Sequence, residues 1–302
     1  MNVEALPGVE RDAALAPFTT FKVGGPADWF VRAHRSADVK AAIAAARGDG
    51  LPVTILGGGS NVLVADAGLR GLVIRLHGGD VRHVSNGVIR ADGGVTINGL
   101  VRWTITRGVA GLEAWAGTPG TVGGAIYGNA HFKGRLIGEL VESVELLTPE
   151  GTQRRVDAAA MGFGYDRSRL QQTHEIVLSV DFHAGRGEPA ALRAVARESL
   201  AYRKRTQPLE SPSAGCIFQN PDAAIDCLPD GMPSSAGALV DRAGLKGFAT
   251  GGARVSPAHG NFIVNDGSAM AADIRRLIEL CRERVHSRFG IALRDEIVYL
   301  GF

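Results

Sequence analysis

Two glycine-rich segments in the first half of the chain have the composition of a backbone that binds an anion. The first is GGGSN at residues 57–61, and the second is GTPGTVGGAIYGNA at residues 117–130. Because glycine has no Cβ, successive main-chain amides can turn inward and a pyrophosphate can approach the main chain closely. A single glycine cluster is more often a simple loop. Two clusters that each run into an asparagine, Asn61 and Asn129, favour a bound nucleotide over two plain loops.

The spacing of these residues argues against the commonest ways of holding a nucleotide or a metal ion. The chain has no G-x-G-x-x-G that opens a helix and no G-x-x-x-x-G-K-[ST], which disfavours a Rossmann site and a P-loop. No serine nucleophile elbow accompanies His259, and His174, His183 and His286 lack the spacing of metal ligands. We therefore expect no metal site, and a nucleotide held by a different scaffold.

Length and charge narrow the class of protein. A chain of 302 residues, with 45% hydrophobic and 21% charged residues, is long enough for two or three globular domains. Its 33 basic and 31 acidic residues give a net charge of +2, so we expect no large cationic face for nucleic acid. The 41 glycines are about twice the usual share, which predicts many tight turns and close main-chain contacts.

The sequence also indicates where the protein works. Its N-terminal stretch, MNVEALPGVERDAALAPF, has no basic segment before an apolar run and does not resemble a signal peptide. No apolar stretch approaches the ~18–20 residues of a membrane-spanning helix. Cys216, Cys227 and Cys281 contain no CxxC pair, which is typical of a reducing compartment. We expect a cytoplasmic protein that does not bind a membrane.

The first half of the chain alternates helices and strands that would position the glycine segments. A helix is predicted from Ser36, its cap, to about Gly48–Gly50, followed by an apolar strand that ends at the first glycine segment. Asn86-Gly87 lies between two short β-prone runs and predicts a hairpin. Residues 96–107 are predicted to form a helix before the second glycine segment, and residues 142–151 and 175–182 two further strands.

The second half begins with a change of composition near residue 183. Pro189 is well placed to start a helix, whose buried face would carry Leu192, Val195, Ala196 and Leu200. A second helix over residues 271–288 is stopped by a glycine, and the chain ends in a predicted strand over residues 291–302. The helical spacing of the second helix predicts five buried residues, Ile274, Leu277, Ile278, Cys281 and Val285.

Seven separated motifs resemble, in order and spacing, those of the UDP-N-acetylenolpyruvoylglucosamine reductase (MurB) family. The resemblance runs from about Thr19 to the C-terminus, and the chain is similar to the shorter family type that lacks a tyrosine-bearing loop. It implies an α+β protein: an FAD-binding fold of the vanillyl-alcohol-oxidase type, made of two α/β subdomains, and a C-terminal α+β substrate domain. The motifs are TTFKVGGPADWF, LGGGSNVLVAD, GLEAWAGTPGTVGGAIYGNA, SPSAGCIFQNP, SAGALVDRAGLKG, GGARVSPAHGNFIVNDG and FGIALRDEI.

The resemblance assigns boundaries and cofactors. FAD-binding subdomains are expected at residues 1–80 and 81–188, the substrate-binding domain at 189–290, and a strand with a catalytic glutamate at 291–302. FAD would be bound non-covalently and reduced by NADPH. Both glycine segments would lie along the FAD, chiefly its pyrophosphate; their predicted contacts are Gly57, Gly58, Gly59, Ser60, Asn61, Gly117, Gly120, Thr121, Gly123, Gly124 and Asn129.

The implied reaction is the reduction of UDP-N-acetylglucosamine enolpyruvate to UDP-N-acetylmuramate in peptidoglycan precursor synthesis. It needs a hydride, which no side chain can donate, and also a proton donor, a cation and a carboxyl group. The resemblance makes Cys216 the proton donor, although family members commonly have serine there, and Glu296 the catalytic carboxyl group. Without the resemblance, Cys216 reads as a small buried hydrophobe and Glu296 as a solvated charge on an edge strand.

The arginine expected in the catalytic motif is displaced by one position in this chain. The family motif has Tyr, Arg, a variable residue and Ser, whereas this chain has Asp166 in place of the arginine and Arg167 after it. Arginine suits the task because its planar fork can bind a carboxylate through two hydrogen bonds, so we predict Arg167 as the third catalytic residue. Alternatively, Arg167 is only a surface partner of Asp166, and Arg169 is a further candidate.

Substrate binding would fall to Arg203 and Asn220, which match motif positions for the diphosphate and the nucleotide sugar. Arg203 could instead belong to a solvated basic turn with Lys204 and Arg205. A UDP-sugar is the expected partner, and no oligomer is implied. Two alternatives remain open: a flavin oxidase on the same scaffold, and a catalytically silent nucleotide-sugar binding protein, suggested by the cysteine and the displaced arginine.

Overall fold

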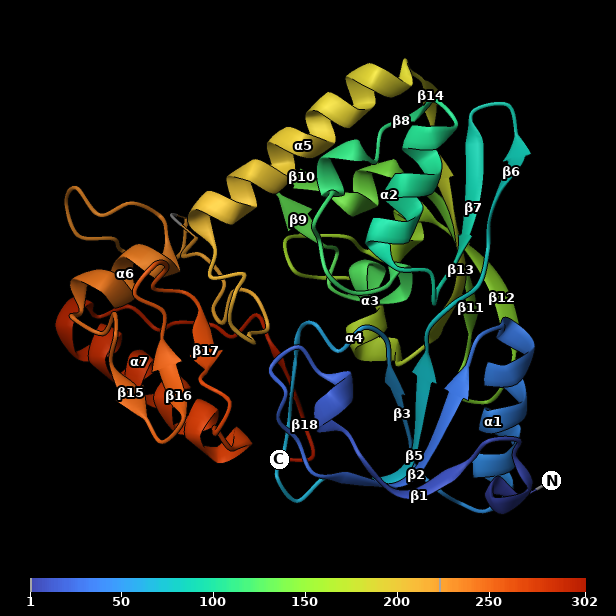
Figure 1. Ribbon diagram of the computed structural model, residues 1–302, viewed down its shortest axis with the longest axis horizontal. Helices are drawn as coiled ribbons and strands as arrows, with labels where there is room; N and C mark the ends of the chain where they lie inside the picture. The colour runs from blue at the N-terminus through green and yellow to red at the C-terminus, as the bar shows by residue number, and fades with distance from the viewer. Residues whose placement is uncertain (1, 223) are drawn as a thin grey trace. The chain divides into compact units, whose positions relative to one another are not determined.

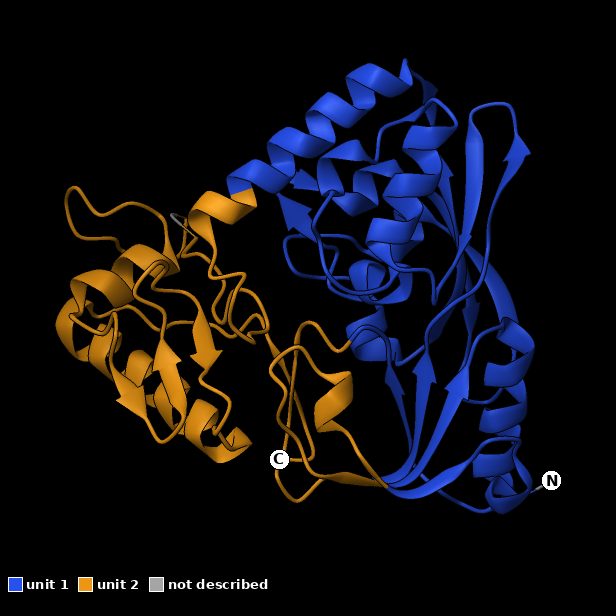
Figure 2. Ribbon diagram, in the orientation of Figure 1, with its two compact units in different colours: residues 1–12, 28–58, 70–202 blue, residues 13–27, 59–69, 203–302 orange. Residues whose placement is uncertain are grey.

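The computed structural model describes residues 2–222 and 224–302, and their contacts divide the chain into two compact units (Figure 2). Unit 1 comprises Met1–Asp12, Asp28–Gly58 and Arg70–Tyr202, and unit 2 comprises Ala13–Ala27, Gly59–Leu69 and Arg203–Phe302. The units therefore do not follow the predicted boundaries at residues 80, 188 and 290. Two early segments group with the last hundred residues because they pair with them over long sequence distances, which local patterns do not reveal.

The first sheet has four strands in the order β1-β2-β5-β3, with β3 and β5 parallel. Helix α1 (Ser36–Gly48) buries Val39 and Ile43 with the apolar side chains of this region. Ser36 is the first residue of the helix and not its cap; instead, the Asp38 carboxylate accepts hydrogen bonds from the amides of His34 and Arg35, both at 3.0 Å. The strands are β1 (Glu10–Ala14), β2 (Pro26–Ala33), β3 (Val53–Leu56) and β5 (Leu69–Leu76).

The second sheet of unit 1 has five antiparallel strands in the order β12-β11-β13-β7-β6. The predicted hairpin is confirmed: β6 and β7 flank Gly87, whose φ of +80° lies in the left-handed region. Helices α2 (Ile97–Thr106) and α3 (Val122–Tyr127) cover one face of this sheet (Figure 1). The strands are β6 (Val81–Ser85), β7 (Val88–Asp92), β11 (Val141–Leu147), β12 (Gln153–Asp157) and β13 (Ile176–His183).

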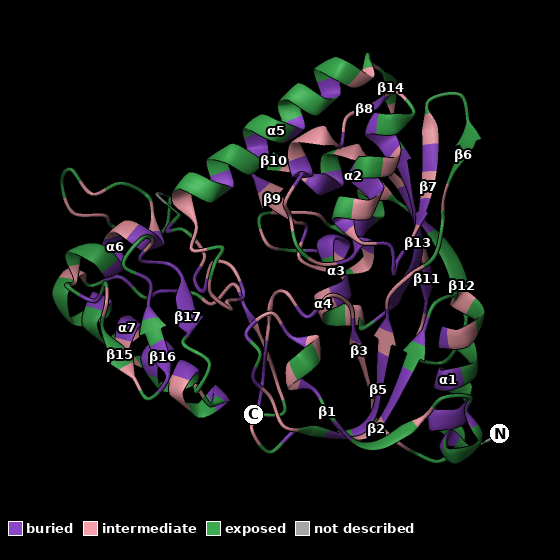
Figure 3. Ribbon diagram, in the orientation of Figure 1, coloured by how far each residue is buried: buried purple, intermediate pink, exposed green. Residues whose placement is uncertain are grey.

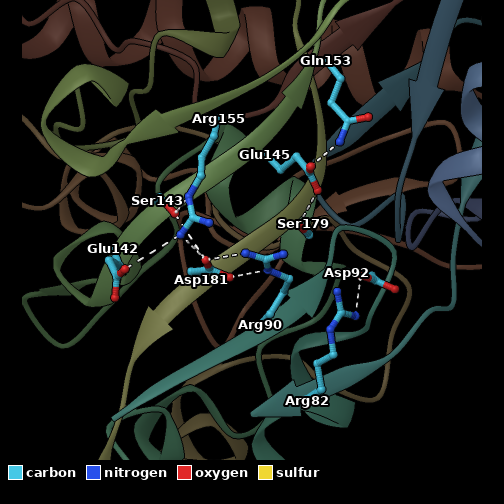
Figure 4. A network of polar contacts seen from close by, with 10 residues as sticks. All are labelled: Arg82, Arg90, Asp92, Glu142, Ser143, Glu145, Gln153, Arg155, Ser179 and Asp181. Carbon is cyan, nitrogen blue, oxygen red and sulfur yellow. Dashed lines mark hydrogen bonds and ion pairs between the residues drawn. The ribbon is translucent and has the colours of Figure 1, made fainter. Parts of the chain in front are cut away.

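The opposite face of this sheet carries a network of charged and polar side chains (Figure 4). Period-two alternation sends Val144 and Val180 into the core and their neighbours to the polar face. Asp181 is 2% exposed and binds Arg90 Nε and Nη2 at 2.6 and 2.8 Å, and Arg155 Nη2 at 2.5 Å. Burial opposes the charge of Asp181, but the two guanidinium groups outweigh it and hold the pKa of this carboxyl group below its ordinary value.

Asp181→Asn is expected to lower the free energy of unfolding by about 3 kcal/mol near neutral pH, because it leaves two arginines facing a neutral amide. A carboxyl group whose pKa is lower in the folded state stabilises the fold at pH values above its unfolded pKa of ~3.9. The difference in unfolding free energy between wild type and variant should therefore shrink as the pH falls below about 4. Urea unfolding at several pH values measures this. Glu10→Gln, which breaks the exposed Arg32–Glu10 pair, is the control, with an expected cost of at most ~1 kcal/mol. Equal effects would contradict the role of Asp181.

Unit 2 is built around helix α7 (Ala271–Phe289), which packs near α6 (Ala236–Arg242) and a small sheet in the order β15-β16-β17. All five residues predicted to face the core from α7 are buried. The carboxylate of Asp66 caps this helix by accepting from the amides of Ala271 and Ala272 at 2.8 and 2.9 Å. The remaining strands of the unit are β4 (Val62–Val64), β15 (Ala249–Thr250), β16 (Ala253–Val255), β17 (Ile263–Asn265) and β18 (Val298–Leu300).

Two sequence predictions were wrong in detail. Helix α5 (Pro189–Thr206) buries Leu192 and Ala196, but Val195 and Leu200 are 40% and 46% exposed, since only a narrow stripe of this helix is covered (Figure 3). The terminal strand is confined to β18, which pairs in parallel with β4, and the residues before it form only an isolated bridge between Asp295 and Phe218.

The remaining elements are short. None of the helices among the described residues has both the length and the apolar character needed to cross a membrane. The short elements are η1 (Val3–Ala5), η2 (Ala16–Phe18), η3 (Glu113–Trp115), η4 (Ile137–Leu140), η5 (Ala158–Met161), α4 (Leu170–Thr173), β8 (Val109–Ala110), β9 (His131–Phe132), β10 (Arg135–Leu136) and β14 (Gly185–Arg186).

Candidate active site

The two glycine segments lie against each other in unit 1, main chain to main chain. A Cβ placed on Gly57 would lie 2.4 Å from Thr121 Oγ1, and one placed on Gly58 would lie 2.5 Å from the Cα of Gly120. Side chains do not fit at such distances, so the packing requires glycine at both positions. Gly57 and Gly58 directly follow β3, and Thr121 is the N-cap of α3, so rigid elements hold both segments.

The end of the first glycine segment belongs to unit 2 and contacts the C-terminal part of the chain. Thr20 N donates to Gly59 O at 2.9 Å, and Val298 N donates to Asn61 O at 2.9 Å. The side-chain amide of Asn61 donates to the main-chain oxygen of Glu296, also at 2.9 Å. Asn61 was predicted only as a cofactor contact. Its side-chain hydrogen bond to the main-chain oxygen of Glu296 was not predicted.

Asn129, at the end of the second segment, is fully buried and adopts a left-handed φ of +47°. Its side chain donates to Gly164 O at 2.7 Å and accepts from Gly138 N at 2.9 Å. Both ends of the amide are therefore engaged by the protein, and a cofactor contact from Asn129 would come from its main chain.

The predicted cation lies in a tight turn over residues 164–167. Gly164 and Arg167 exchange main-chain hydrogen bonds of 3.0 and 3.2 Å. The guanidinium group of Arg167 is folded back over this turn: a Cβ placed on Gly164 would lie 3.3 Å from Arg167 Nε. Among the described residues, Asp166 forms its ion pair with His131, whose Nδ1 lies 3.1 Å from Asp166 Oδ1, and not with Arg167. The other candidate, Arg169, pairs with Glu175 at 3.2 Å.

Cys216 and Glu296 belong to neighbouring antiparallel segments of unit 2. Glu296 N donates to Ile217 O at 2.8 Å, and Gln219 N donates to Arg294 O at 2.8 Å. Cys216 is partly exposed, whereas the next residue, Ile217, is 1% exposed, so the cysteine is not simply part of the core. The structure thus brings the predicted proton donor and the predicted carboxyl group together within one unit.

A buried asparagine that sequence reasoning missed fixes the cysteine segment. Asn261 is 3% exposed; its side chain accepts from Phe218 N at 2.9 Å and donates to Phe218 O at 2.7 Å. Its main-chain oxygen accepts from Ile217 N at 2.9 Å. The only sequence signal was a polar residue inside the apolar run GNFIVN.

The predicted substrate residues also lie in unit 2. Arg203 is 7% exposed, and this burial lowers its pKa to about 10, while the nearby Cys216 acts in the opposite direction. The solvated-turn interpretation therefore applies to Lys204 and Arg205, which are exposed, but not to Arg203. Asn220 Oδ1 accepts from Ala236 N at 3.1 Å, at the start of α6.

Comparisons with known proteins cover nearly the whole chain. Residues 27–157 match the FAD binding domain family, and residues 207–300 match the C-terminal domain of UDP-N-acetylenolpyruvoylglucosamine reductase. The reductase of Heliobacterium modesticaldum is 41% identical over 94% of this chain and 88% of its own length, and that of Gloeobacter violaceus is 39% identical over 100% and 98%. The crystal structure of the reductase (MurB) from Thermus caldophilus matches with a TM-score of 0.80 and 33% identity, covering 97% of this chain and 98% of that one.

Proposed function

The chain belongs to the UDP-N-acetylenolpyruvoylglucosamine reductase family, and from this we propose how its residues divide the work of the reaction. The protein is an α+β oxidoreductase with an FAD-binding domain and a family-specific C-terminal domain. It uses FAD and NADPH to reduce UDP-N-acetylglucosamine enolpyruvate to UDP-N-acetylmuramate, a step of peptidoglycan precursor synthesis. Its partner is a small UDP-sugar, and we propose that it acts in the cytoplasm.

We propose that the main chain of residues 57–61 and 117–124 holds the FAD. The observation that supports this is the packing of Gly57 and Gly58 on Gly120 and Thr121, which leaves no room for side chains. When bound, FAD supplies the hydride transfer that no side chain can perform. The side chain of Asn129 fixes the end of the second glycine segment through its hydrogen bonds to Gly164 and Gly138.

Cys216 is proposed as the general acid and Glu296 as the carboxyl group that works beside it. A thiol, with an ordinary pKa of ~8.5, is mostly protonated near neutral pH and can deliver a proton to the substrate carbon. Asn261 and Asn61 hold the two segments, so the geometry needed for proton transfer is set before substrate binds. Arg203 and Asn220 are proposed to bind the diphosphate and the sugar.

Anaerobic half-reactions test this function. NADPH should bleach the flavin absorbance, and the enolpyruvyl UDP-sugar should restore it. A flavin oxidase would instead be reoxidised by oxygen and not by the sugar. A silent binding protein would bind the sugar without recovery of the absorbance. Either of the last two results would contradict the proposed function.

Asn61→Ala is expected to lower kcat/KM for the enolpyruvyl substrate about fivefold, because one lost hydrogen bond of about 1 kcal/mol releases the Glu296 segment. Stopped-flow rates of the two half-reactions measure the effect. Asn61→Asp is the matched variant: it keeps the size of the side chain but loses the donor, so it should also be slow. An Asn61→Asp variant with wild-type rates would contradict this role of Asn61.

A further inference from the structure

The turn that should supply the cation presents a buried carboxylate instead. Asp166 has a left-handed φ of +50°, and its side chain is only 9% exposed. A non-glycine residue in this conformation is uncommon and is kept when the surroundings fix it. Here Gln171 Nε2 donates to Asp166 O at 2.9 Å, and Asn129 holds the first residue of the turn through Gly164 O.

His131 is the side chain that pairs with the buried carboxylate of Asp166. Its Nδ1 lies 3.1 Å from Asp166 Oδ1, and its ring packs on Tyr165 with centroids 4.7 Å apart. A buried carboxylate is costly unless it is paired, and the contact with His131 provides that pairing. The carboxylate accepts from Nδ1–H, so Nε2 is directed away from Asp166; Nε2 is an acceptor in the neutral ring and a donor in the imidazolium.

A second observation indicates that this pair meets a ligand or ordered water. Asp166 Oδ2 is buried and has no hydrogen-bond partner among the described residues. Buried polar atoms are almost always satisfied, so this oxygen calls for a donor from a molecule outside the protein chain. Arg167, whose guanidinium is folded over Gly164, does not reach hydrogen-bond contact with it.

We propose that His131, oriented by Asp166, supplies the positive charge at the enolpyruvyl carboxylate that the family resemblance assigns to an arginine. The imidazolium would donate through Nε2 and stabilise the negative charge that develops beside the carboxylate when hydride is added; it transfers no proton and no electrons. His131 would be a catalytic residue, and Asp166 a positioning residue that acts through it. This inference rests on the proposed function.

The test compares variants in the two anaerobic half-reactions. His131→Ala should slow reoxidation by the enolpyruvyl sugar about 100-fold, the loss typical of one electrostatic donor, and leave reduction by NADPH near the wild-type rate. His131→Asn, which retains a donor for Asp166 but cannot carry charge, should be equally slow. Arg102→Ala, which removes an exposed arginine of helix α2 that has no assigned role, should have little effect.

A double mutant and a rescue separate catalysis from folding. Because Asp166 acts through His131, adding Asp166→Asn to His131→Ala should cause no further loss. Asp166→Arg in the His131→Ala background should recover at least part of the rate by returning a guanidinium to position 166. Fast reoxidation of both His131 variants, or equal losses in both half-reactions, would overturn the inference. If wild type itself is not reoxidised by the sugar, the proposed function has failed instead.

Discussion

Replacing Cys216 with Ala is expected to slow reoxidation of the reduced flavin by the enolpyruvyl substrate about 10²- to 10⁴-fold, the usual contribution of a general acid. Reduction by NADPH should be unchanged, because that half-reaction needs no proton from the thiol. Stopped-flow absorbance in the absence of oxygen measures the two rates separately.

Cys216→Ser is the control for this variant. Serine is the residue that the family commonly has at this position, so it should retain most of the activity lost in Cys216→Ala. The segment is fixed by Asn261 through main-chain contacts at Ile217 and Phe218, so neither substitution should disturb its path. A second half-reaction that runs at the wild-type rate in Cys216→Ala would refute the assignment.

Glu296→Gln is the second substitution with a large expected effect. It removes a group that can exchange a proton or hydrogen-bond an enol, and it leaves the size of the side chain almost unchanged. We expect reoxidation by substrate to slow about 10²-fold or more, with NADPH reduction intact. The same stopped-flow assay measures it.

Glu283→Gln, on helix α7, gives a matched control for the loss of one carboxylate in unit 2. It should behave like wild type. If Glu296→Gln and Glu283→Gln are indistinguishable, Glu296 has no part in the proton step.

Elements with a strong local pattern were predictable from the sequence. The spacing of apolar residues in α7 predicted five buried side chains correctly, because the helical period repeats over nineteen residues. The same argument failed at Val195 and Leu200 of α5, where the pattern was present but the covering surface is narrow. Periodicity identifies a helix, but neighbours decide how much of its apolar face is buried.

The polar contacts that organise the site could not be predicted in this way. Asn61 and Glu296 are 235 residues apart in the chain, and Asn261 and Phe218 are 43 apart. An asparagine after a glycine run reads as a turn or a ligand contact, and nothing local indicates that it holds a distant strand. The pairing of Asp166 with His131 is equally invisible without the fold. The composition of the glycine segments predicted a close approach of the main chain to a ligand, but not that the two segments contact each other.

The visible spectrum of the purified protein, before and after denaturation, shows whether the glycine segments hold FAD. We expect a yellow protein that releases about one FAD per chain when it unfolds, since the cofactor is held by packing against glycine main chain and not by a covalent bond. A colourless protein that cannot be reconstituted with added FAD would contradict it.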